Sequence, residues 1–167
     1  KGPLHGAANK KVMDMMSDIK EHVSDWSSEK ELTAYLEQIV RKQAHDGSGK
    51  LFGLGHAVYT KSDPRAIILK EKARELAESA GRMDEFNLYN SVAKLGPEVF
   101  AHVKNSSKVI APNVDFYSGF VYDCMGIPQA VYTPMFALAR TAGWAAHRVE
   151  SIITGSRVIR PAYKFVG

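Results

Sequence analysis

Apolar residues recur every three or four positions along most of this chain, and this spacing constrains the fold more than any other feature of its 167 residues. The first such face runs through Ala8, Val12, Met15, Met16, Ile19 and Val23. A second face follows a polar break and comprises Leu32, Leu36, Ile39 and Val40. This period is that of an α-helix with one buried face. Because no run alternates apolar and polar residues as a half-buried strand does, the sequence predicts an all-α fold.

Polar residues, glycine and proline mark where these helices begin and end. Ser28, followed three positions later by Glu31, has the pattern of a capping box. Asp63 directly before Pro64 predicts the start of a further helix, and Gly81 predicts its end. Between residues 44 and 64 the periodicity stops, so we expect a long loop there. Such loops in compact domains are usually either functional or disordered.

The second half of the chain contains three further helical stretches. Gly96-Pro97 predicts an interruption of the pattern that extends from residue 86 to residue 103. An aromatic helix is expected over residues 116–125. The most apolar window, residues 127–146, contains two prolines and Arg140, so we interpret it as a buried helix and not as a membrane span. The last helix, from Pro134 to Ile153, is rich in alanine and glycine, and we expect it to pack closely against other helices or to lie at an interface.

Composition limits the classes of protein that remain. With 45% hydrophobic and 24% charged residues, the chain can bury a core. The single cysteine, Cys124, excludes a disulfide framework and a multi-cysteine zinc site and fits a reducing compartment. We see no targeting segment and expect a cytoplasmic protein with no membrane partner. A net charge of +4 suits an anionic small molecule as well as nucleic acid.

Three polar clusters carry the residues that suit acid–base chemistry. They lie at residues 2–6, 53–65 and 112–115, each beside an expected helix and shaped by glycine or proline. His5, His56 and Asp115 are candidate general acids and a general base. Three arginines are candidate ligands for substrate carboxylates, since a guanidinium binds a carboxylate with two parallel hydrogen bonds: Arg65, Arg140 and Arg160.

Simpler interpretations of these residues remain open at this point. A loop histidine is more often structural than catalytic, and Asp115 is an acceptable cap for the helix that follows it. The glycine-rich loop matches no phosphate-binding motif, and no basic patch interleaved with aromatic residues indicates nucleic acid. We assign no chemistry and no metal to the remaining histidines, which are His22, His45, His102 and His147. The residues alone specify an anion site but no reaction.

Four sequence strings together resemble the citrate synthase family. They are GPLHGAAN at residues 2–9, GLGHAVYTKSDPRA at residues 53–66, PNVDFYSG at residues 112–119 and RPAYKFVG at residues 160–167. They follow the family's order and span essentially the whole chain. The match is to the C-terminal portion of the family. The resemblance implies a large-domain loop at residues 1–9, a small mobile helical domain at 10–126, and a C-terminal segment of the large domain at 127–167.

The resemblance also implies a reaction and residue roles. The family condenses acetyl-CoA with oxaloacetate and hydrolyses citryl-CoA to citrate and CoA, with no metal and no prosthetic group. Asp115 is then expected to remove a proton from the acetyl methyl, His5 to stabilise the enolate, and His56 to polarise the oxaloacetate ketone. Arg65 and Arg140 are expected to bind the oxaloacetate carboxylates. The resemblance implies that Arg160 does so from the partner subunit of a homodimer. The loop expected to contact CoA comprises Leu51, Phe52, Gly53, Leu54 and Gly55.

Several alternatives share these motifs. A 2-methylcitrate synthase that uses propionyl-CoA differs only in its acyl pocket, and a citryl-CoA-cleaving lyase module runs the chemistry backwards. A non-catalytic CoA-binding or dimerisation module and a helical nucleic-acid binder are the remaining possibilities. Another oxaloacetate-binding histidine of the family lies upstream of Lys1. We therefore expect the chain to be a piece of a longer protein that folds at least over residues 10–125 but has little synthase activity alone.

Overall fold

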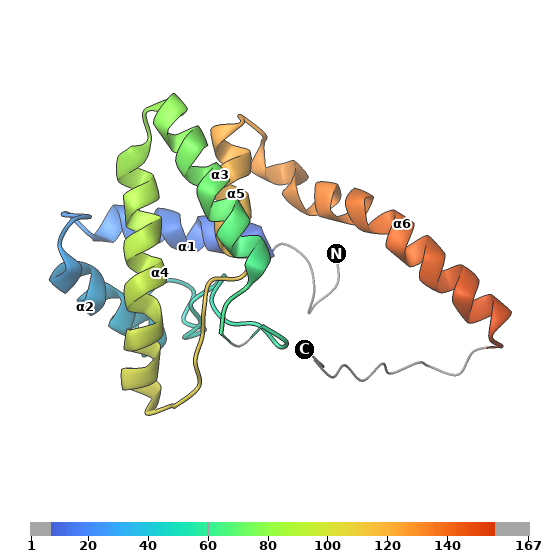
Figure 1. Cartoon of the computed structure of the whole chain (residues 1–167). Coiled ribbons are helices and arrows are strands. Elements are labelled where there is room, and N and C mark those ends of the chain that lie inside the picture. The colour runs from blue at the N-terminus through green and yellow to red at the C-terminus, as the bar shows by residue number, and fades with distance from the viewer. Residues whose placement is uncertain (1–7, 60, 156–167) are drawn as a thin grey trace. The chain divides into compact units, whose positions relative to one another are not determined.

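The structure, a computed structural model, describes residues 8–59 and 61–155 (Figure 1). Over these residues the only β-pairing is one isolated antiparallel bridge, Leu54 with Pro112, so the expected all-α fold is confirmed. None of the helices in this part of the chain is long and apolar enough to cross a membrane. The helices are α1 (Ala8–His22), α2 (Glu29–Val40), α3 (Pro64–Ala80), α4 (Met83–Lys104), α5 (Val114–Cys124), the 3₁₀-helix η1 (Gln129–Val131) and α6 (Tyr132–Ile153).

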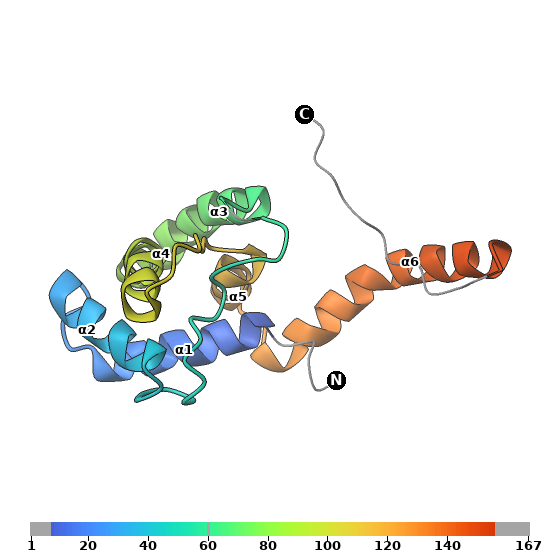
Figure 2. The same ribbon diagram turned by 90° about the horizontal axis from the view of Figure 1, so that it is seen from below.

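The chain divides into two compact units, Lys1–Thr133 and Pro134–Gly167. In the first unit α5 lies between α3 and α1, and α4 packs on α2 and α3 (Figure 2). An aromatic cluster fills the centre, where the Tyr89 ring lies 5.5 Å from that of Phe116 and 4.9 Å from that of Phe120. Gly119 lets α1 approach α5 closely, because a Cβ there would lie 2.8 Å from Cγ of Met13.

The predicted helix boundaries are confirmed at α2 and α3. The Ser28 hydroxyl accepts a hydrogen bond from the Glu31 amide at 3.3 Å, which is one half of the capping box. The Glu31 carboxylate does not return to the Ser28 amide. It accepts instead from the amides of Ser24 and Asp25, at 3.2 and 2.8 Å, and so ties the α1–α2 turn to α2. Asp63 caps α3, and Gly81 ends it in the left-handed conformation, with φ 67°.

The predicted interruption at Gly96-Pro97 is wrong, because α4 continues through it from Met83 to Lys104. A proline inside a helix removes one backbone hydrogen bond and costs about 3 kcal/mol. Burial offsets that cost, since Leu95 and Val99 on either side are buried. Gly96 does not break the helix. It allows Leu54 to pack closely on α4, because a Cβ at this position would lie 2.6 Å from Cδ1 of Leu54.

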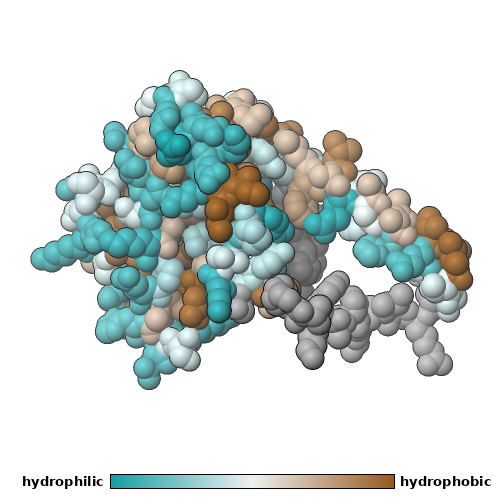
Figure 3. Space-filling view, in the orientation of Figure 1, coloured by the Kyte–Doolittle hydropathy of each residue, from teal (hydrophilic) through white to brown (hydrophobic). Residues whose placement is uncertain are grey.

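The burial expected for residues 127–146 is not found within the described part of this chain, and the alternative expectation, a place at an interface, stays a prediction. Of the residues of α6, only Tyr132 is buried, and its exposed apolar side chains include Leu138 and Ile153, at 77% and 78%. Figure 3 shows the hydrophobic surface at the far end of α6. The physical reason is that the described part of the second unit is a single helix, which has no second layer of its own to cover its apolar residues.

A half-buried ion network ties three helices of the first unit together. Arg82 donates to Glu85 on α4 at 2.8 Å, and it pairs with Asp123 on α5 at 2.7 Å. Lys20 on α1 pairs with the same Glu85 carboxylate at 2.9 Å. The hydrogen bond from Arg82, together with Lys20, lowers the pKa of Glu85 to about 2, against the desolvation that burial imposes.

We expect Glu85→Gln to remove stability that is present only when this carboxyl group is charged. Its folded pKa of about 2 lies below the ordinary glutamate value of 4.5, so the stabilisation is full above pH 4.5 and is lost as pH falls toward 2. The free energy of unfolding at pH 7 should fall by roughly 2–3 kcal/mol. Urea unfolding at pH 7, 5 and 3 measures this. The difference from wild type should shrink at pH 3, whereas Glu71→Gln, on the exposed face of α3, should change little at any pH.

Candidate functional site

The side chain of Asp63 joins the starts of two helices. Its carboxylate, 1% exposed, accepts a hydrogen bond from the Arg65 amide in the first turn of α3 at 3.0 Å. It also accepts one from the amide of Val114, the first residue of α5, at 3.1 Å. Each helix N-terminus carries a partial positive charge that favours an anion. Asp63 therefore fixes the positions of the α3 and α5 N-termini relative to each other.

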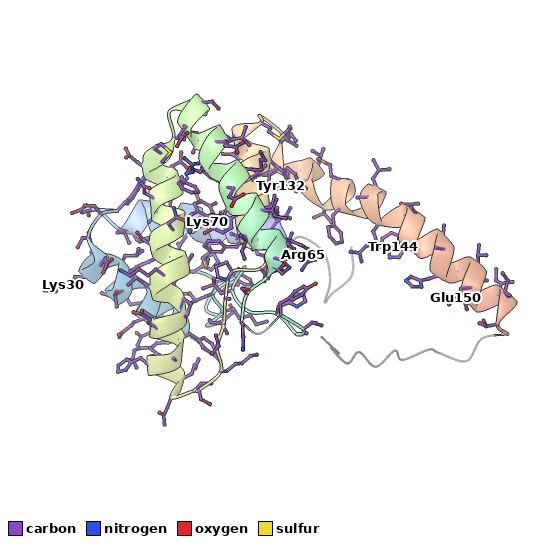
Figure 4. All side chains as sticks on the ribbon, viewed as in Figure 1. Lys30, Arg65, Lys70, Tyr132, Trp144 and Glu150 are labelled. Carbon is purple, nitrogen blue, oxygen red and sulfur yellow. The ribbon has the colours of Figure 1, made fainter. Side chains whose placement is uncertain are left out.

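Arg65 is held by the same carboxylate. Its Nε and Nη2 donate to the two oxygens of Asp63 at 3.0 and 2.8 Å. These bonds are the largest influence that lowers the pKa of Asp63, and they raise the pKa of Arg65. The guanidinium is also stacked over the Tyr59 ring, 5.3 Å from its centroid. Its Nη1 edge has no partner among residues 8–59 and 61–155, and it is free to bind a substrate carboxylate at the start of α3 (Figure 4).

His56 lies in the loop that precedes α3, and its ring orientation is fixed by its own backbone. Nδ1 accepts hydrogen bonds from the amides of Val58 and Tyr59, at 3.0 and 3.1 Å. A nitrogen that accepts from two N–H groups carries no proton of its own, so this network assigns the proton of the neutral ring to Nε2. The His56 ring also lies 5.0 Å from that of Tyr59. His56 thus presents an N–H donor on the side of the ring away from its loop.

Asp115 is the second residue of α5, and its carboxyl group is half-buried. Burial raises its pKa, and the neighbouring Asp63 charge adds to that effect, while Arg65 and His56 act in the opposite direction. The simple capping role is wrong, because Asn113 is the cap: its Oδ1 accepts from the Asp115 amide at 2.9 Å. Within the described residues, no hydrogen bond engages the Asp115 carboxylate. It is therefore a carboxylate available as a base.

Backbone hydrogen bonds fasten the His56 loop to the segment before α5. The amide of Gly55 donates to Ala111 at 2.7 Å, and the amide of Asn113 donates to Gly53 at 2.8 Å. Gly53 has φ +79°, and a Cβ there would lie 2.8 Å from side-chain carbons of both Val12 and Phe116. The loop consequently lies against α1 and α5 at a distance that only glycine permits.

A groove of about 480 Å³ follows this loop. Its wall is formed by residues 49–57, which include the five loop residues expected to contact CoA, and by Phe100 and Ile110. Two cations, Lys50 and Lys108, also line it. The sequence does not predict that these two lysines meet, because they are 58 positions apart and nothing in their local pattern indicates it. The groove combines an apolar floor with positive charge, as a ligand with aromatic and phosphate groups requires.

The structure brings His56 and Arg65 close enough to Asp115 for both to lower the pKa of its carboxyl group. Arg140 belongs to the second unit, where its guanidinium lies 5.0 Å from the centroid of the Phe136 ring one helical turn earlier. His5 and Arg160 lie outside the described residues. In the part of the chain that the structure describes, no three His, Cys, Asp or Glu side chains are grouped as metal ligands.

We expect Asp63→Ala to lower the free energy of unfolding by about 2–4 kcal/mol, because it removes the cap of α3 and the bond to α5 together. Asp84→Ala is the matched control, since Asp84 is an exposed carboxylate in the first turn of α4. That change should cost at most about 0.5 kcal/mol. Urea unfolding at pH 7 checks both values. Equal effects would contradict the bridging role of Asp63.

Gly53→Ala should destabilise the fold more than Gly47→Ala, although both glycines have positive φ, +79° and +67°. At Gly47 an added Cβ meets nothing within 4 Å, so only the backbone strain of about 1–2 kcal/mol remains. At Gly53 the Cβ collides with α1 and α5, which should add roughly 1–3 kcal/mol. Thermal and urea unfolding of the two variants test this; similar losses would show that the loop is not tightly seated.

Comparison with known proteins places this geometry in a family. The family model "Citrate synthase, C-terminal domain" matches residues 1–162. Citrate synthases of Corynebacterium glutamicum and Acidithiobacillus ferridurans are each 39% identical over 99% of this chain, which covers 36% and 39% of their lengths. A solved citrate synthase of Thermoplasma acidophilum, in a ternary complex with carboxymethyl coenzyme A and oxaloacetate, matches 100% of the chain with a TM-score of 0.69 and 34% identity. The citrate synthase structure from Thermotoga maritima gives 0.67 and 34%.

The chain spans about two fifths of the length of these relatives. The family model covers nearly all of it, and both the sequence relatives and the structural neighbours carry the same family name. This chain belongs to the citrate synthase family and matches its C-terminal domain.

Proposed function

We propose that this chain carries the acid–base and substrate-binding residues of a citrate synthase, which joins the methyl carbon of acetyl-CoA to the ketone carbon of oxaloacetate and then hydrolyses the thioester. One observation carries the proposal: a half-buried carboxylate with a raised pKa, Asp115, lies in the same charge cluster as a fixed N–H donor, His56, and a half-occupied guanidinium, Arg65. The solved relative that binds oxaloacetate and carboxymethyl coenzyme A supports this substrate pair.

In this proposal Asp115 removes a proton from the acetyl methyl group. A carboxylate in water is a weak base for such a carbon acid, and burial that raises the pKa of Asp115 makes it a stronger one. Because the charged form of a partly desolvated carboxylate is disfavoured, proton uptake relieves that cost. The enolate oxygen that results requires a hydrogen-bond donor, the role that the family resemblance gives to His5.

His56 and Arg65 act on oxaloacetate in the proposed reaction. Nε2–H of His56 donates a hydrogen bond to the ketone oxygen and stabilises the negative charge that develops there as the new carbon–carbon bond forms. The unoccupied edge of Arg65 binds one carboxylate with two parallel hydrogen bonds. Arg140, and Arg160 from the partner subunit of a homodimer, are proposed as the remaining carboxylate ligands.

The groove along residues 49–57 is the proposed CoA site. Gly53 and Gly55 line this groove, and Phe100 and Ile110 supply apolar surface for a flat base. Lys50 and Lys108 offer positive charge to the CoA phosphates. We propose that CoA is bound as substrate and product and not as a resident cofactor.

We propose that the chain alone has little activity, because the family resemblance places another oxaloacetate-binding histidine upstream of Lys1. The decisive experiment replaces the matched segment of the Thermoplasma acidophilum relative with this chain. We expect oxaloacetate-dependent loss of the acetyl-CoA thioester absorbance by the hybrid. Asp115→Asn should lower kcat by roughly 10²–10⁴-fold, whereas Asp14→Asn, an exposed carboxylate on α1, should leave it unchanged.

Two results would contradict this assignment. Full activity of the Asp115→Asn hybrid would exclude Asp115 as the base. A clear preference for propionyl-CoA over acetyl-CoA would identify the alternative, a 2-methylcitrate synthase. Should the hybrid not fold, CoA binding to this chain tests the groove directly: NMR amide shifts on adding CoA should be centred on residues 49–57 and be weaker in the Lys50→Ala, Lys108→Ala double variant.

A further inference from the structure

We propose that Asn113 is a positioning residue that connects the His56 loop to the helix that carries Asp115; the inference rests on the roles proposed above for those two residues. Asn113 lies between the two segments, two residues before Asp115 in sequence. Its side chain is the only one in the described residues that hydrogen-bonds to both the start of α5 and the backbone adjacent to His56.

The two ends of the carboxamide bind different partners. Oδ1 accepts from the Asp115 amide at 2.9 Å, and Nδ2 donates to the carbonyl of Gly55, directly before His56, at 2.8 Å. The partners fix which end is which, because a flipped amide would set N–H against N–H and oxygen against oxygen. One rigid, planar carboxamide thus positions both the backbone of Asp115, the proposed base, and the peptide directly before His56, the proposed donor.

The bond from Asn113 to the Gly55 carbonyl is the last hydrogen bond that joins the His56 loop to the segment before α5. The amide of Gly55 donates to Ala111, but among described residues the hydrogen bonds of residues 56–59 are internal, from Val58 and Tyr59 to His56 Nδ1. Gly55 has φ +89°, in the left-handed region, where the chain turns. The orientation of the loop therefore depends on how the Gly55 peptide is held, and Asn113 holds its carbonyl oxygen.

Capping alone does not explain an asparagine at this position. Serine, aspartate and asparagine cap helices about equally well. Of these three, only asparagine carries its acceptor and its donor on two separate atoms, one for α5 and one for Gly55, whereas a serine hydroxyl has both on a single oxygen. Aspartate would set a carboxylate oxygen against the Gly55 carbonyl and add a negative charge beside Asp63 and Asp115. The capping function and the tethering function can therefore be separated by substitution.

The test uses this chain and needs no substrate. Asn113→Ser should keep the cap, so the Asp115 amide retains its protection from hydrogen exchange, while the Val58 and Tyr59 amides exchange about fivefold faster or more, as the loss of one hydrogen bond predicts. Asn113→Asp should do the same and serves if the serine variant does not fold. Asn113→Ala should accelerate exchange at all three amides.

The imidazole of His56 supplies a signature that a loss of stability alone would not produce. In wild type its ¹⁵N shifts should report one tautomer with the proton on Nε2, and in Asn113→Ser they should move toward a mixture of tautomers. Ser28→Ala is the matched control, because it removes a cap from α2. It should lower the melting temperature and leave both the His56 shifts and the Val58 and Tyr59 exchange rates unchanged.

Unchanged His56 shifts and loop exchange rates in both Asn113→Ser and Asn113→Asp would overturn the proposal, as would equal changes in Ser28→Ala. These readouts are independent of turnover. If the Asp115→Asn hybrid remains active but the exchange rates and His56 shifts change as expected, the proposed role of Asp115 is wrong and the positioning role of Asn113 is supported. If the tether results fail while the hybrid enzyme behaves as expected, only the role of Asn113 is wrong.

Discussion

The buried carboxylate of Asp63 is the constraint from which the rest of the site is built. It accepts hydrogen bonds from the first turns of both α3 and α5 and holds the guanidinium of Arg65 with a bidentate pair. A buried anion is costly unless hydrogen bonds satisfy it, and here two helix N-termini and an arginine do so. Because one group serves all three, the positions of α3, α5 and Arg65 depend on one another.

The pKa values of two carboxyl groups in this cluster, Asp63 and Asp115, are shifted in opposite directions, and this difference distinguishes a structural carboxylate from a proposed base. Arg65 and backbone amides lower the pKa of Asp63, whereas burial raises that of Asp115. Asp63 thus gives stability that is retained above the unfolded pKa and lost in acid. Asp115 lowers stability as pH rises through its raised pKa. A carboxylate kept charged by its partners suits a scaffold, and one that gains from taking up a proton suits a base.

Sequence reasoning succeeded where a single segment determines the outcome. Asp63-Pro64 and Ser28 were identified as helix starts because capping involves only the next three residues. The predicted helix break at Gly96-Pro97 is wrong, because the burial of α4 on either side outweighs the low helix propensity of glycine and proline. The burial expected for α6 is not found either, because an apolar helix is buried only where another element covers it; its expected place at an interface stays a prediction.

The less predictable part of the site is the pairing of segments far apart in the chain. The sequence places Gly53 and Gly55 in a loop, but only the structure relates them to Ala111 and Asn113, which lie 56 to 60 positions later. The sequence favours Asp115 as the cap of α5, but the cap is Asn113. The two cannot be told apart locally, because a carboxylate and a carboxamide are equally good acceptors for a helix start. What distinguishes them is the donor on Nδ2, and its partner is not a neighbour in sequence. Asn113 meets a local requirement, the cap of α5, and a distant one, the bond to Gly55. Its local sequence indicates only the first.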